Sequence, residues 1–88
     1  MNYILDVRPI THKEALYDAL VESLELPDYM GHNLDALWDV LSERSDPMTL
    51  LLVNARFLPH NLGDYGLGVL NLFGDLDLQT CHTVLLKW

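Results

Sequence analysis

Apolar and polar positions follow two patterns along the chain, short apolar runs and longer stretches with helical spacing. Short runs rich in β-forming residues predict strands at residues 2–7, 48–54 and 83–87. Apolar residues that recur three and four positions apart predict helices at residues 12–24, from 34 to about 42 or 44, and at 65–76, and residues 55–62 could hold a short one. This order predicts an α/β fold, a single domain over residues 1–88 in which a small three-stranded parallel sheet is packed with three to four helices.

The ends of the predicted helices carry capping and turn residues. Residues 11–14 form a capping-box pattern in which Thr11 would begin the first helix and Glu14 would reach back to it. Asn33 is the predicted N-cap of the second helix, and Asp64 could cap the last one. Gly31 is expected to adopt a backbone conformation that a side chain would resist.

The interior positions follow from the same periodicity. The run at residues 48–54, MTLLLVN, is apolar on both faces, which suits the middle strand of a parallel sheet covered by helices. The core face of the last helix is expected to carry Leu67, Leu70, Phe73 and Leu76.

The second predicted helix has two distinct faces. A buried stripe is expected at Leu34, Leu37, Trp38 and Leu41, which follow the spacing of an amphipathic helix. Asp35, Asp39 and Glu43 lie four residues apart and therefore stack along a neighbouring stripe. One face would hold the core while the other displays carboxylates.

The charge balance narrows the choice of partner. Thirteen acidic residues oppose five basic ones, for a net charge of −8, and nine of the acids lie between Glu14 and Asp46. This half of the chain would repel nucleic acid, whose phosphates need lysine and arginine. It would attract a basic protein, although the same charge could serve only to keep a small protein soluble.

No catalytic or cofactor site is evident in the sequence. Histidines are dispersed at His12, His32, His60 and His82, and no phosphate-binding, dinucleotide or zinc motif is present. Cys81 is the only cysteine, so no disulfide scaffold forms, and it is expected to be a small buried residue and not a nucleophile. With no membrane span or signal peptide evident, the chain is expected to act in the reducing cytoplasm, without cofactor or metal, as a protein that is not an enzyme.

The acidic stripe admits two chemical interpretations. Asp35 and Asp39 could form an acid–base pair, but that chemistry needs a concave, partly dry site. They could instead imitate phosphates and pair with arginines in a basic cleft. Tyr29 and Trp38 flank the stripe as candidate interface anchors, while core packing of Trp38 and incidental exposure of Tyr29 stay open as alternatives.

The stretch LPDYMGHNLDALWDVL at residues 26–41 strongly resembles the barstar family of intracellular ribonuclease inhibitors. The family pattern is carried, without a gap, by Leu26, Pro27, Asp28, Tyr29, Gly31, Asn33, Leu34, Asp35, Ala36, Leu37, Trp38 and Asp39. The rest of the chain agrees in length and in the order of its elements. The resemblance implies a three-stranded parallel sheet packed with helices, and stoichiometric inhibition of a small basic ribonuclease such as barnase.

The resemblance also implies a role for each matched position. Tyr29 would pack on the catalytic face of the enzyme, and Asp39 would occupy its phosphate site. The other implied partner-binding residues are Gly31, Asn33, Leu34, Asp35 and Trp38, with Asp75 at the position of a family glutamate and Glu43 extending the acidic stripe.

The chain departs from the family at the end of the second helix. Glu43-Arg44 replaces a glycine–tryptophan pair, and Arg44 would add a positive charge at the rim of the interface. Because altered rims shift specificity, a second interpretation is an immunity or binding module for a different basic partner, such as a related toxin.

Overall fold

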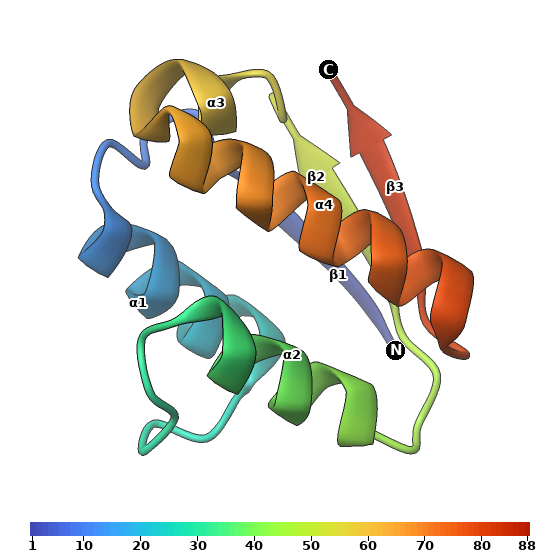
Figure 1. The fold of residues 1–88 in the computed structure, drawn as a ribbon. Helices are drawn as coiled ribbons and strands as arrows, with labels where there is room; N and C mark the ends of the chain where they lie inside the picture. The colour runs from blue at the N-terminus through green and yellow to red at the C-terminus, as the bar shows by residue number, and fades with distance from the viewer.

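Three parallel strands form one sheet in the order β1-β2-β3, and four helices lie to one side of it, with α1 and α4 in contact with the strands (Figure 1). The computed structural model describes all residues, 1–88. Its elements are β1 (Asn2–Asp6), α1 (Lys13–Leu24), α2 (Leu34–Glu43), β2 (Thr49–Val53), α3 (Phe57–Leu62), α4 (Asp64–Gln79) and β3 (Thr83–Lys87). The predicted parallel sheet, its central second strand and the short helix after it are therefore confirmed.

The sheet is covered by helices on one face only (Figure 1). Along β1, Tyr3 and Leu5 are buried while Ile4 between them is exposed, so one side of the strand meets the core and the other meets solvent. The prediction of helix cover over the middle strand is thus right for one face and wrong for the other. The residues of β2 that face away from the helices are shielded only partly, by side chains of the flanking strands.

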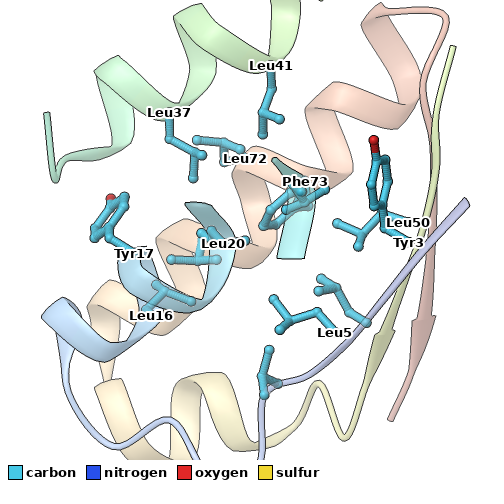
Figure 2. Close-up of a cluster of buried hydrophobic side chains, with 14 of the residues drawn as sticks. Tyr3, Leu5, Leu16, Tyr17, Leu20, Leu37, Leu41, Leu50, Leu72 and Phe73 are labelled. Atoms are coloured by element: carbon cyan, nitrogen blue, oxygen red, sulfur yellow. The ribbon is translucent and has the colours of Figure 1, made fainter. Parts of the chain in front are cut away.

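The core lies between the covered face of the sheet and the helices. Figure 2 shows Leu37 and Leu41 of α2 pointing toward Leu72 and Phe73 of α4, and all four are almost fully buried. Leu50 from β2 closes the core on the sheet side. Because α2 packs mainly on α4, it forms an outer layer whose far face is free.

The buried face of α4 differs from the predicted one. Val69, Leu72, Phe73 and Leu76 are buried, whereas Leu67 is 48% exposed. Gly66 explains the rotation, because a Cβ there would lie 2.0 Å from the carbonyl oxygen of Leu58. The missing side chain lets α3 and α4 approach closely, and that contact fixes which side of α4 faces inward.

Two predicted helix starts are wrong. His12, and not Thr11, caps α1, since its Nδ1 accepts a hydrogen bond from the Ala15 amide at 3.3 Å. Asp64 makes no capping hydrogen bond at the start of α4, where Gly63 has a φ of 60° and turns the chain.

None of the helices has the combination of length and apolar character that a membrane span requires.

Candidate functional site

The acidic stripe on α2 is exposed to solvent. Asp35, Asp39 and Glu43 are all exposed, and Leu37 and Leu41 on the opposite side of the helix are fully buried. The two faces predicted for this helix are therefore present. Since the carboxylates recur every four residues, they form a row of negative charge along the outer layer of the molecule.

The N-terminus of α2 is capped as the sequence predicted. The side-chain oxygen of Asn33 accepts a hydrogen bond from the Ala36 amide at 2.8 Å. Asp35 lies in the first turn, where the helix dipole favours a negative charge. This cap fixes the point at which the preceding loop turns into the helix.

Tyr29 projects from that loop between two buried anchors. Its side chain is 88% exposed, whereas Leu26 and Met30 on either side are 7% and 6% exposed. The Met30 amide donates to the Pro27 carbonyl at 3.1 Å, which closes a tight turn around Tyr29. A large aromatic ring held in solvent by a structured turn suits a contact with another molecule.

The backbone conformation predicted for Gly31 is not observed. Its φ is not positive, but a Cβ would lie 3.1 Å from Nδ2 of the Asn33 cap and 3.5 Å from Cβ of Ala36. A side chain at position 31 would therefore press on the Asn33 cap, while its contact with Ala36 would be an ordinary one.

His32 anchors the loop and was not identified as a site residue from the sequence. Its ring stacks on Tyr17 of α1, with centroids 5.2 Å apart, and its Nδ1 lies 2.6 Å from Oε2 of Glu14. Glu14 therefore pairs with His32 and not with Thr11. No sequence signal marked these contacts, because the partners lie 15 and 18 residues before the histidine.

Leu34, Trp38 and Asp75 lie where α2 meets α4. Leu34 and Trp38 are partly buried against the core, and Leu34 contacts Gly68, where a Cβ would lie 3.1 Å from its Cδ1. Asp75 is exposed and follows Gly68 by seven residues, two helical turns, so it lies on the same side of α4. Asp75 therefore shares the side of α4 that meets Leu34 at Gly68.

A shallow groove of about 290 Å³ lies at the other end of the stripe. It is lined by Glu25, Leu26, Pro27, Tyr29, Val40, Glu43 and Arg44. Arg44 is partly buried and contributes to this lining, so its positive charge lies at the rim beside the acids Glu25 and Glu43. Its guanidinium donates to the Leu24 carbonyl at 3.0 Å and to the Tyr3 hydroxyl at 2.9 Å, which holds the side chain against α1 and β1.

The remaining candidate chemistry does not assemble into a site. Asp35 and Asp39 do not line the groove, so they lack the enclosed surroundings that an acid–base pair needs. No group of three or more histidine, cysteine, aspartate or glutamate side chains is positioned to hold a metal ion. Cys81 is exposed, and the expectation that it is buried is wrong, because it lies in the turn between α4 and β3.

Residues 1–83 match the family described as Barstar (barnase inhibitor). The chain belongs to the barstar family. It is also 46% identical, over 70 residues, to the "Putative ribonuclease inhibitor YrdF" of Bacillus subtilis (strain 168), in an alignment that covers 78% of this chain and 77% of that protein. The barstar-like α/β fold and the family resemblance of residues 26–41 are thereby confirmed, and membership points to an inhibitor more than to an enzyme.

Proposed function

We propose that this chain is a stoichiometric inhibitor of a small basic ribonuclease of the barnase type, acting in the cytoplasm. The observation that carries this proposal is the exposed carboxylate row of α2 beside the displayed ring of Tyr29. The barstar family and the ribonuclease inhibitor relative support the same class of target. No catalytic step, cofactor or metal is part of the proposal.

The row of carboxylates would replace the phosphates of RNA in the active-site cleft. A ribonuclease cleft carries arginine, lysine and histidine to bind its substrate, and charge-assisted hydrogen bonds to a carboxylate are among the strong ones. Asp39, in the middle of the row, is assigned to the phosphate site. Asp35 and Glu43 lie one turn to either side of it and would meet the neighbouring basic groups.

The flanking residues would shape the contact around these charges. Tyr29 is assigned to the catalytic face, where a buried aromatic anchor contributes much of the binding energy. Gly31 and Asn33 hold the loop, and Leu34 and Trp38 supply apolar area beside the carboxylates. Asp75 extends the acidic surface onto α4.

Titration of a barnase-type ribonuclease with the purified protein tests this proposal. We expect loss of activity that is linear in added protein and complete at one inhibitor per enzyme, because a tight inhibitor blocks each cleft once. Activity that is unchanged at a large excess of protein would contradict a barnase-type target.

The second candidate is an immunity or binding module for a different basic protein, such as a related toxin. The rim of the groove favours this second candidate. Glu43 and Arg44, whose guanidinium binds the Tyr3 hydroxyl, occupy the positions of the family's glycine–tryptophan pair. Capture of partners on the immobilised protein, with an Asp39→Ala column as the matched control, separates the two candidates. A basic ribonuclease retained only by the unaltered protein favours inhibition, and a basic protein without ribonuclease activity favours the second candidate.

A further inference from the structure

The uncovered face of the sheet carries an apolar row across all three strands. The strand register aligns Ile4 with Leu51 and Leu51 with Leu85. Ile4 is 70% and Leu85 is 52% exposed, and no helix lies against this face of the sheet (Figure 1). An apolar row on an open sheet face is a candidate contact surface.

The next row along the strands is charged at its two ends. The register aligns Asp6 of β1 with Val53, and Val53 with Lys87 of β3, so one acid and one base flank an apolar residue. Lys87 makes no ion pair within the chain, where the one ion pair joins His32 and Glu14. Hydrogen bonds from Asn54 and from the Arg8 amide hold the pKa of Asp6 below its usual value, so this carboxylate is charged at neutral pH.

We propose that two copies of this chain pair through their open sheet faces, about a two-fold axis that runs between the two β2 strands and parallel to them. This operation lays β1 of one copy over β3 of the other. Ile4 then meets Leu85 of the second copy, and Leu51 meets its own equivalent. Asp6 meets Lys87 of the second copy, and the same pair recurs on the other side of the axis.

Charge complementarity favours a second copy of the chain as the partner of this face, and it favours this orientation of the two copies. A two-fold axis across the strands would instead lay Asp6 over Asn2 and Lys87 over Thr83, which leaves both charges without a counter-charge. An arrangement that satisfies two ion pairs and one apolar row by a single symmetry operation points to a second copy of the chain. Face-to-face sheets with nearly aligned strands are a common packing.

The size of the face predicts a weak dimer. Five residues at about 3.3 Å and three strands about 4.8 Å apart give a patch of roughly 17 by 10 Å before side chains are counted. Stable interfaces bury about 800 Å² per partner, so this one lies well below that class. Because α2 lies on the other side of the core, the dimer would leave both acidic stripes free, and its existence does not depend on the proposed inhibition.

Sedimentation equilibrium of the full chain, from about 10 µM to about 1 mM, tests the proposal in the range where small interfaces associate. We expect the weight-average mass to rise from 10.1 kDa toward twice that value. The net charge of −8 on each copy opposes association, so the experiment uses about 0.15 M salt, where the Debye length is about 8 Å. A mass that stays at 10.1 kDa throughout would overturn the proposal.

Charge reversal identifies the face and its symmetry. Lys87→Glu places two like-charge pairs in the interface and should raise the dissociation constant at least about tenfold, and Asp6→Lys added to it should restore dimerisation. Failure of the folded double variant to dimerise would overturn the two-fold arrangement. Since Asp6 also binds Asn54, Leu85→Thr gives a second test that leaves that contact intact.

Leu85→Thr keeps a β-forming residue but removes apolar area, so it should weaken the dimer. Leu78→Thr is the matched control, because Leu78 is 83% exposed on α4 and lies outside the sheet. The proposal is overturned if both threonine variants weaken association equally, or if neither Leu85→Thr nor Lys87→Glu changes it.

Discussion

His32 stacks face to face on Tyr17, with ring planes 9° apart and centroids separated by 5.2 Å. The contact joins the loop before α2 to the buried side of α1. The Tyr17 hydroxyl in turn is hydrogen-bonded to the Tyr65 hydroxyl of α4, and burial raises the pKa of Tyr17 above its usual value, so the ring stays neutral. The loop that displays Tyr29 is therefore attached to the rigid part of the molecule.

His32→Ala should weaken inhibition although His32 is not assigned to the partner contact. Without the stack and the Glu14 contact, the loop must be ordered on binding, which costs about 0.5–1.5 kcal/mol for each newly immobilised side chain. We expect the inhibition constant to rise by about 3- to 10-fold, with a lower melting temperature.

His60→Ala is the control, because His60 is exposed on α3, away from α2. An inhibition constant that is equal in the His32→Ala and His60→Ala proteins would show that the stack does not order the loop.

Arg44 should act on stability through Tyr3. Two of its side-chain hydrogen bonds connect the end of α2 to the last turn of α1 and to β1. Arg44→Ala should lower the free energy of unfolding by about 1–3 kcal/mol, because hydrogen bonds to a charged group contribute more than neutral ones. Tyr3→Phe removes only the hydroxyl, so a double-mutant cycle in urea isolates the pair and should give a coupling of at least about 0.5 kcal/mol. Additive effects would contradict a direct bond.

His82 should be a structural residue whose loss destabilises the fold. It is 2% exposed, its Nδ1 accepts from the Met48 amide at 3.2 Å, and its Nε2 donates to the Leu41 carbonyl at 3.0 Å. His82→Ala leaves the Met48 amide without a partner, whereas the Leu41 carbonyl still accepts from the Arg44 amide at 3.3 Å. A buried unpaired group costs about 1–3 kcal/mol, and the cavity left by the buried ring adds to this cost. We expect a loss of at least about 2 kcal/mol in chemical denaturation, and a loss below about 0.5 kcal/mol, as at ordinary surface positions, would refute this role.

Asp6 should contribute stability that disappears in acid. Hydrogen bonds from Asn54 and from the Arg8 amide lower its pKa in the folded state relative to 3.8 in the unfolded chain. The contribution is therefore fully present above pH 3.8 and is lost as the pH falls through the lower, folded-state pKa. The melting temperatures of the wild type and Asp6→Asn should differ at pH 6 and converge in strong acid. A difference that persists unchanged at low pH would contradict this linkage.

The helix that carries the site could be predicted from local rules. Asn33 caps it, the apolar stripe through Leu37 and Leu41 is buried, and Asp35 and Asp39 are displayed, because helical periodicity determines which faces are apolar. Tertiary contacts decided the features that were not predicted. The stack of His32 on Tyr17 joins residues distant in the sequence.

The uncovered face of the sheet also escaped prediction. A middle strand is apolar on both sides whether helices cover one face of the sheet or both. The flanking strands partly shield Leu51 and Val53 in either case, so the sequence of β2 does not distinguish the two arrangements. The buried face of α4 differs from the predicted one because Gly66 has no side chain and lets α3 approach closely. Hydrophobic periodicity contains no information about such a contact.

The inhibition constant of Asp39→Ala, compared with that of Asp18→Ala on a barnase-type ribonuclease, tests the central claim most directly. Both aspartates are exposed, but Asp18 lies on α1 outside the acidic stripe. Truncation of a charged hot-spot residue costs about 2 kcal/mol or more in binding free energy, a generalisation for which an aspartate of barstar is itself an example. Asp39→Ala should therefore weaken inhibition at least about 30-fold. Asp18→Ala should change it less than about twofold. Equal effects of the two substitutions would contradict the assignment of α2 to the active-site cleft.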